Sequence, residues 1–148
     1  MRIILGRKAD AVRQAFTDAF ADKNSEYYKT AVREKRLFSD GLCYIGYLWD
    51  CMKNRETVSE KAALERASQA EKVLVMWDLN SKEMIPVPNY WKYPKSAVLE
   101  LPGSKLESIL PTLPEDVYFF DESFLWTAAL THEYGDKGRR YCLVCDLR

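Results

Sequence analysis

The sequence has no apolar stretch that approaches the roughly 20 residues needed to cross a lipid bilayer. Its first eight residues, Met1 to Lys8, contain an apolar core that is too short for a secretion signal. From these two absences we expect a soluble protein that does not associate with membranes and that resides in the cytoplasm.

Signatures of common enzyme classes are missing as well. The sequence has no GxGxxG or GxxxxGK phosphate-binding loop, no HExxH zinc motif, and no serine or cysteine in a glycine elbow. We therefore predict that the protein is not an enzyme and that it has no cofactor and no bound metal.

The four cysteines do not have the arrangement of a metal or redox site. Cys142 and Cys145 have the spacing of a ligand pair, but they fall in a strand-like run, where they point to opposite faces. Cys43 and Cys51 lie in a predicted helix and would be about 12 Å apart along its axis, too far to share an ion. We expect all four to be buried, reduced thiols.

The composition is that of one soluble globular domain. A chain of 148 residues, 47% hydrophobic and 30% charged, is long enough to bury a core without disulfides or metals. No repeat, linker or low-complexity tract divides it, so we predict a single domain over residues 1–148.

Helical periodicity dominates the first seventy residues. Apolar residues recur at spacings of three and four, and Thr57 or Ser59 can cap the last of the predicted helices. The predicted helices cover Ala9 to Asp22, Glu26 to Lys35, Leu42 to Met52 and the residues from this cap to Ala70.

From Val73 onward the pattern changes to short runs of β-forming residues separated by turn signals. One short helix, Lys105 to Leu110, interrupts them. The predicted strands are Val73 to Trp77, an edge strand at Met84 to Pro88, Ala97 to Leu101, Val117 to Phe120, Trp126 to Glu133 and Tyr141 to Cys145. The fold class is therefore α+β, with a helical N-terminal half packed on a mainly antiparallel sheet formed by the C-terminal half.

Alternation in the strand from Trp126 to Glu133 places Trp126, Ala128, Leu130 and His132 on one face, which we expect to face the core. The small Ala128 leaves room for a large ring from the helical layer. We predict that Trp126 packs against Trp49 or Tyr47.

Charge is unevenly distributed along the chain. From Glu107 to Asp136 there are seven acidic residues and no lysine or arginine, although the whole chain has a formal net charge of zero. A concentrated negative patch attracts and selects a cationic partner. The predicted partner-binding residues are Asp121, Glu122, Glu133 and Asp136, and the alternative is that these acids are spread around a solvated rim.

His132 is the only histidine of the chain, and it is followed by Glu133. Neighbouring residues of a strand point to opposite faces, so the two cannot easily share a metal ion. The first interpretation is a structural role, in which a core histidine is hydrogen-bonded to a backbone or carboxylate partner. The functional alternative is a small-molecule site or an active site, with a ligand pocket formed by His132, Trp91 and Thr131.

The aromatic residues around Trp91 could also stack on a base or sugar, because Tyr90 and Tyr93 flank it. No basic stripe accompanies them. We therefore expect no nucleic-acid partner and interpret these rings as a cover over the core.

The run from Phe119 to Glu133, FFDESFLWTAALTHE, resembles the C-terminal signature of a family of small, uncharacterised bacterial proteins, Asp-x-x-Phe-x-Trp-Thr-x-x-x-Thr-His-Glu. The segment GYLW at 46–49 and the alanine-rich segment 61–70 are similar to the layout of that family, so the likeness spans roughly residues 38–135. The chain departs from it at Arg139 to Asp146.

What the resemblance implies is a compact bacterial α+β protein. The size and style are also similar, at the level of a class, to bacterial immunity proteins. We therefore expect a protein-binding module that neutralises a cationic toxin domain through its acidic surface.

Overall fold

The computed structural model describes all 148 residues. Seven antiparallel strands form one sheet in the order β1-β6-β5-β7-β8-β9-β4. Their bounds are β1 Arg2–Ile4, β4 Arg55–Val58, β5 Val73–Trp77, β6 Val98–Leu101, β7 Val117–Phe120, β8 Trp126–Tyr134 and β9 Arg140–Asp146. A separate hairpin pairs β2 (Arg36–Phe38) with β3 (Gly41–Cys43).

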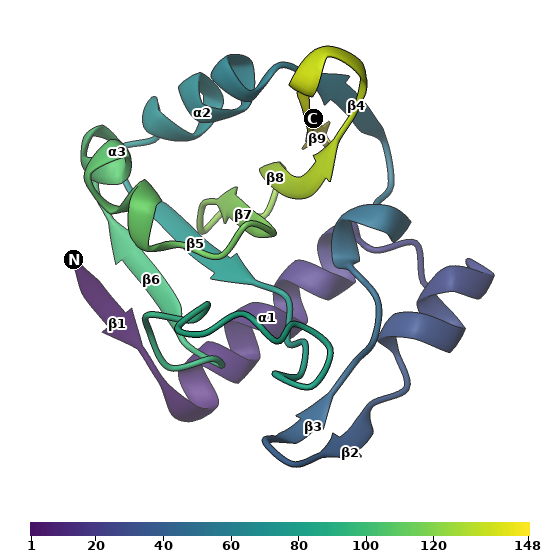
Figure 1. Cartoon of the computed structure of the whole chain (residues 1–148). Helices are drawn as coiled ribbons and strands as arrows, with labels where there is room; N and C mark the ends of the chain where they lie inside the picture. The colour runs from purple at the N-terminus through teal and green to yellow at the C-terminus, as the bar shows by residue number, and fades with distance from the viewer.

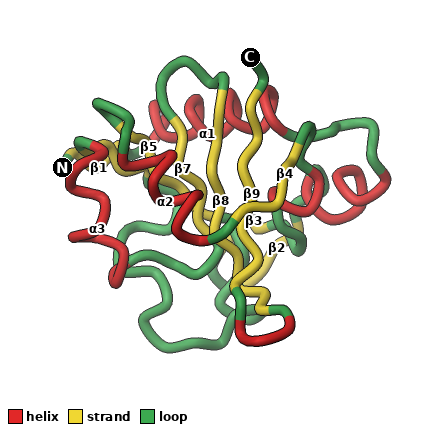
Figure 2. The backbone as a smooth tube through the Cα atoms, turned by 90° about the horizontal axis from the view of Figure 1, so that it is seen from above, coloured by secondary structure: helices red, strands yellow, loops and turns green.

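Helices lie on both sides of the large sheet. Figure 1 shows the sheet between α1 (Gly6–Phe20) and α2 (Glu60–Ser68), and Figure 2 shows the same layers from above. The shorter helical segments are the π-helical η1 Tyr28–Val32, α3 Leu106–Ile109, and the 3-10 turns η2 Leu48–Cys51, η3 Gly103–Lys105, η4 Leu110–Thr112 and η5 Asp136–Gly138. None of these helices has the length and hydropathy that a membrane span requires.

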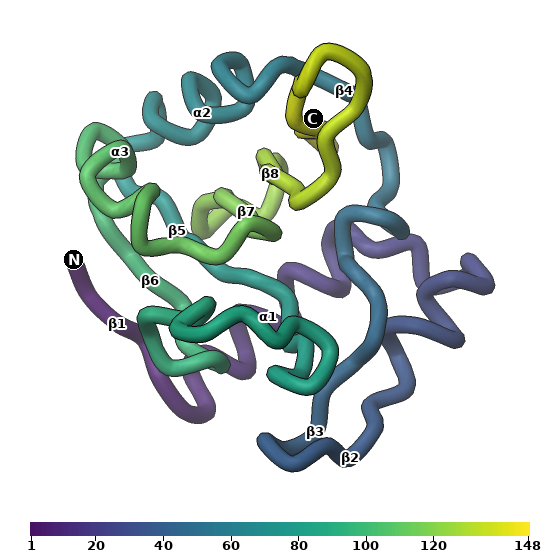
Figure 3. The backbone as a smooth tube through the Cα atoms, viewed as in Figure 1, coloured from purple at the N-terminus to yellow at the C-terminus, as the bar shows by residue number.

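The fold class predicted from the sequence is confirmed, because helices of the N-terminal half pack on a mainly antiparallel sheet. The N-terminal half also supplies two strands to the large sheet. Figure 3 shows the chain starting at β1, the strand at one edge of the sheet. At the opposite edge, β4 pairs with β9.

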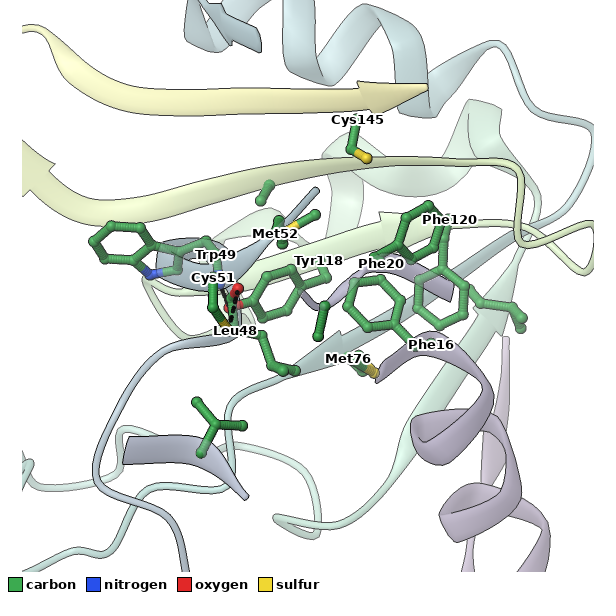
Figure 4. Close-up of a cluster of buried hydrophobic side chains, with 14 of the residues drawn as sticks. Phe16, Phe20, Leu48, Trp49, Cys51, Met52, Met76, Tyr118, Phe120 and Cys145 are labelled. Carbon is green, nitrogen blue, oxygen red and sulfur yellow. Dashed lines mark hydrogen bonds between the residues drawn. The ribbon is translucent and has the colours of Figure 1, made fainter. Parts of the chain in front are cut away.

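Each face of the sheet has its own hydrophobic core. The first core lies on the side of α1 and includes Phe16 and Phe20 with Met76, Tyr118 and Phe120 from the strands (Figure 4). The second lies on the side of α2 and includes Ala63 and Ala67 with alternate strand residues, among them Trp77, Phe119, Trp126 and Leu130. Because both faces are covered, the central strands consist of continuous apolar runs.

Two predicted elements are wrong. The segment from Leu42 to Met52 is not a helix: after β3 it runs in irregular form to η2. Met84 to Pro88 forms no strand and belongs to a long loop between β5 and β6. The predicted helix Glu26 to Lys35 is shorter than expected, and its centre is the π-helical η1.

The buried segment after β3 avoids a helix because other parts of the chain satisfy its backbone donors. Tyr44 N donates to the Leu79 carbonyl at 3.2 Å, and the amides of Ile45 and Gly46 donate to the Ala31 carbonyl at 3.1 and 2.8 Å. A buried backbone needs such partners whatever its conformation. The uniform apolar character of this segment therefore reflects burial rather than helical structure.

The predicted partner of Trp126 is also wrong. Trp126 lies in the second core under α2, where the Arg66 guanidinium stands 4.1 Å from the ring centroid. Trp49 belongs to the first core, on the other side of the sheet. The predicted burial is correct, since Trp126 is only 2% exposed.

Candidate functional site

His132 lies near the end of β8, where the strand becomes irregular. β8 pairs with β9 in regular register from Trp126 to Leu130, and the register shifts between Leu130 and Tyr134. The ring of His132 lies against Tyr47, with the centroids 4.9 Å apart, and is 6.0 Å from Trp49. Both partners pack on the first core, so the strict alternation predicted for His132 does not hold.

A buried carboxylate holds the histidine ring. Asp116 Oδ1 accepts hydrogen bonds from the backbone N–H of His132 at 3.0 Å and from the Trp49 indole at 2.9 Å, and it lies 2.9 Å from His132 Nδ1. The Asp116 side chain is 4% exposed, whereas that of His132 is 39% exposed. An ionised Asp116 requires the proton on Nδ1, which leaves Nε2 as the free nitrogen of the neutral ring.

A second buried carboxylate, Asp78, lies one step further inside. It accepts hydrogen bonds from the Tyr44 hydroxyl at 2.9 Å, the Tyr118 hydroxyl at 2.7 Å and the Leu48 amide at 3.0 Å. The Tyr118 oxygen in turn accepts from the backbone N–H of Trp49 at 2.9 Å. Asp78, Tyr118, Trp49, Asp116 and His132 therefore form one continuous polar chain from the core to the surface, which we call the polar relay.

Burial dominates the electrostatics of the polar relay. It raises the pKa of Asp78 to about 7, although the three hydrogen bonds favour the ionised form. Burial also raises the pKa values of Tyr44 and Tyr118 well above their usual value, and the nearby charge of Asp78 acts in the same direction. Both tyrosines therefore remain neutral donors.

Aromatic rings surround the exposed end of the polar relay. Tyr47 stacks on Trp49 with centroids 5.5 Å apart and planes inclined by 25°, and the Tyr141 ring lies 5.7 Å from that of Trp49. Burial, and then the charge of Asp116, raise the pKa of Tyr47 to about 12. We call the partly exposed rings of Tyr47, His132 and Tyr141 the aromatic surface.

The four predicted partner-binding acids do not lie together. Asp121 and Glu122 are in the turn between β7 and β8, whereas Glu133 and Asp136 are at the far end of β8. The nine residues of β8 span roughly 30 Å at about 3.3 Å per residue. The structure therefore divides the acidic segment into two separate sites.

The two acids of the β7–β8 turn are already engaged. Asp121 accepts hydrogen bonds from the Ser123 amide at 2.9 Å and the Trp126 indole at 2.8 Å, so it orders the turn. Glu122 pairs with Lys72 at 3.1 Å. Glu133 and Asp136 are exposed and form no ion pair; Glu133 directly follows His132, whereas Asp136 lies in the β8–β9 turn beside the exposed Lys137.

The predicted ligand pocket is not assembled. Thr131 is buried, and its hydroxyl donates to the Tyr141 carbonyl at 2.7 Å. Trp91 packs against the second core, near Lys95, and lines a cavity of about 350 Å³ formed by the loop 82–91. Neither His132 nor Thr131 lines that cavity. The Trp91 indole nitrogen is buried and has no hydrogen-bond partner.

The cysteines agree with the sequence analysis. All four are free and buried, and Cys142 and Cys145 lie in the second and first cores, on opposite faces of the sheet. Burial raises the pKa of Cys51 to about 12. No three residues of the types His, Cys, Asp and Glu lie close enough together to hold a metal ion.

Sequence reasoning missed the residues that organise this site, Asp78 and Asp116. Both lie in segments whose sequence indicates a turn, although each directly adjoins a fully apolar strand. An acidic residue next to such a strand is the signal that could have marked them.

Comparison of the chain with protein-family models, curated proteins and solved structures gave no match.

Proposed function

We propose that the protein is a protein-binding module that contacts a cationic partner through the aromatic surface and the neighbouring acids Glu133 and Asp136. The observation that carries this proposal is that His132 is fixed by the buried Asp116, at 2.9 Å, while its ring remains partly exposed beside Tyr47. Rigid aromatic anchors dominate the binding energy of many interfaces, and they lose little conformational freedom on binding.

The carboxylate of Glu133 beside these rings is the feature that favours a basic partner. Glu133 is exposed next to His132, and its charge contributes to the raised pKa of Tyr47 after burial and the aspartates. A lysine or arginine of a partner would meet a carboxylate and an aromatic face together, which combines an ion pair with a cation–π contact. A cationic toxin domain is the partner class that we propose first, on the resemblance of the chain to immunity proteins.

Two charge-matched double variants test which end of β8 binds. Tagged protein would capture partners from bacterial lysate, and each retained protein would then be purified and titrated against the Glu133→Gln/Asp136→Asn variant and the Asp121→Asn/Glu122→Gln variant. We expect the first pair to weaken binding at least several-fold in low salt and the second pair to leave it unchanged. Equal affinities for both variants and the parent would refute the electrostatic proposal.

A second test concerns the rings. Tyr47→Ser and His132→Gln should each weaken binding of the same partner, and Tyr134→Ser, which changes an exposed tyrosine two residues further along the chain, serves as the control. If only Tyr134→Ser loses binding, the partner contacts Tyr134 and not the aromatic surface.

The Asp116–His132 pair also supports a second candidate, a small enzyme in which His132 acts as a general base. A buried carboxylate on Nδ1 is the arrangement that orients catalytic histidines. No serine, threonine or cysteine side chain is hydrogen-bonded to the imidazole, so the attacking group would have to be water or a substrate hydroxyl. A hydrolase substrate screen in which the parent is active and His132→Gln is inactive would favour this candidate over binding alone.

A further inference from the structure

A cavity of about 400 Å³ lies between α1, η1 and the end of β5, and Tyr44 of the Asp78 network lines it. Its volume falls within the range of about 300–1,000 Å³ that is typical of small-molecule sites. Its lining has two different parts, an apolar wall and a set of cations, and each part restricts the ligand that would fit.

The apolar wall comes from the first core. It includes Val32 from η1, Leu48, Met76 from β5 and Leu79, and Figure 4 shows Leu48 and Met76 among the packed side chains of that core. A ligand that fills this part of the cavity must carry an apolar group.

The charged lining is mostly cationic. Arg13, Arg33 and Lys35 line the cavity, and Asp10 is the only carboxylate among the lining residues. Arg33 and Lys35 are exposed at the rim, where Arg33 makes only a loose contact of 3.8 Å with Glu34. The cavity therefore carries an excess of positive charge.

Arg13 is the strongest indication of an anionic ligand. Its side chain is buried and donates to four backbone carbonyls, from Nε to Ser96 at 3.0 Å, from Nη1 to Trp77 at 2.6 Å, and from Nη2 to Lys95 at 3.2 Å and Ala97 at 2.8 Å. A guanidinium has five N–H groups, so one hydrogen of Nη1 has no acceptor within the protein.

No carboxylate forms an ion pair with Arg13. Its guanidinium meets neutral carbonyl groups and stands 5.9 Å from the centroid of the Trp77 ring, and burial lowers its pKa although the charges of Asp78 and Asp10 act in the opposite direction. Buried charges in proteins are normally paired with a counter-charge. Arg13 lines the cavity, so an anion bound there would lie near this unpaired charge.

We propose that this cavity binds a small organic anion, with a carboxylate or phosphate group held by the exposed Arg33 and Lys35, near Arg13, and an apolar or aromatic group against the partly exposed Leu79. The site is separate from the aromatic surface, so the proposal does not depend on the proposed function.

Phenyl phosphate is a suitable probe, because it joins a dianionic group to one aromatic ring. Titration followed by two-dimensional amide NMR should give saturable shifts at residues of α1 and η1. Inorganic phosphate lacks the ring and benzylamine reverses the charge, and both should bind at least about tenfold more weakly. Benzoate in place of phenyl phosphate distinguishes a carboxylate site from a phosphate site.

Two charge-matched variants locate the site. Arg33→Gln/Lys35→Gln removes two cations of the cavity rim. It should weaken the binding of phenyl phosphate about tenfold or more, as expected for the loss of charged hydrogen-bond donors. Lys29→Gln/Arg36→Gln removes one lysine and one arginine from the same part of the chain but outside the cavity lining, and should change the affinity less than about twofold.

Three results would overturn the proposal. These are the absence of any saturable shift with both phenyl phosphate and benzoate, equal weakening by the two double variants, and binding of benzylamine as tight as that of phenyl phosphate. Circular dichroism of each variant verifies that the fold is intact, since all four substituted side chains are wholly or partly exposed.

Discussion

The buried carboxyl of Asp78 should make the protein less stable as the pH rises from 5 to 8. Asp78 is 2% exposed, and burial raises its pKa in the folded protein to about 7. In an unfolded chain the pKa of an aspartate is about 3.9. Between these two values the folded protein retains a proton that the unfolded chain has released, so the free energy of unfolding falls with increasing pH.

The magnitude follows from the difference between the two pKa values. A gap of about three pKa units corresponds to roughly 4 kcal/mol over the whole titration. Most of the loss, about 2–3 kcal/mol, falls between pH 5 and pH 8, because the carboxyl in the folded state titrates around pH 7. This is a large part of the 5–15 kcal/mol that stabilises a typical domain.

Urea unfolding at pH 5, 6, 7 and 8, followed by circular dichroism, measures this effect in the parent and in Asp78→Asn. Asparagine has similar size and does not titrate, so the difference between the two proteins isolates Asp78 from the other ionisable groups. Acids such as Asp40, whose pKa is held well below the usual range by its hydrogen bond to Lys95, lose their stabilising contribution only in more acidic solution.

We expect the stability of the parent relative to Asp78→Asn to fall by about 2–3 kcal/mol from pH 5 to pH 8. The cost of the asparagine itself is the same at every pH and cancels in this comparison. A relative stability that does not change between pH 5 and pH 8 would show that Asp78 is already ionised in the folded protein at pH 5 and that burial does not raise its pKa to about 7.

Three further substitutions test the packing of the core, the close approach of the backbone at Gly103 and the cap of α2. Trp126→Ala should cost about 3–5 kcal/mol in urea unfolding, because Trp126 is 2% exposed in the second core, and a loss below about 1 kcal/mol would contradict its burial. Gly103→Ala should lower the melting temperature, since a Cβ atom there would meet the Ala70 carbonyl oxygen at 2.2 Å, whereas the control Gly135→Ala has no atom closer than 4.0 Å and should melt near the parent. Ser59→Ala should cost about 1 kcal/mol through the loss of the α2 N-cap, and an unchanged unfolding midpoint would argue against the cap.

The sequence predicts the central strands well because each is a short β-forming run with a turn signal beside it. Val73 to Trp77 and Val117 to Phe120 have the observed bounds of β5 and β7. The cap at Ser59 is also correct, since its side chain accepts a hydrogen bond from the Ala62 amide. The sequence predicts an element well where the residues of that segment alone favour one conformation.

Prediction fails where long-range contacts determine the conformation. The segment from Leu42 to Met52 is apolar on all sides, and periodicity alone cannot distinguish a buried helix from a buried irregular segment. The β4 strand from Arg55 to Val58 has little apolar character, and it forms because the edge of β9 offers unpaired backbone groups. The conformation of neither segment follows from its own residues alone.

The site is only half predictable for the same reason. A carboxylate partner for His132 was one of the alternatives, and Asp116 is that partner. The alternation that separates the faces of β8 fails beyond Leu130, because the irregular register moves the His132 ring to the side of Tyr47. Sixteen residues separate Asp116 from His132, and the pairing of β7 with β8 brings them together.

The two buried carboxylates lie together for a topological reason. Asp78 follows β5 and Asp116 precedes β7, and these neighbouring antiparallel strands pair Trp77 with Val117. Both acids therefore lie at the same end of the sheet, where Trp49 bridges them by donating its backbone N–H to Tyr118 and its indole N–H to Asp116. Because Trp49 belongs both to the first core and to the support of His132, its substitution would alter both the stability and the proposed binding. His132 is the terminal member of the polar relay and its side chain is partly exposed, so substitutions there are the ones that separate the two effects.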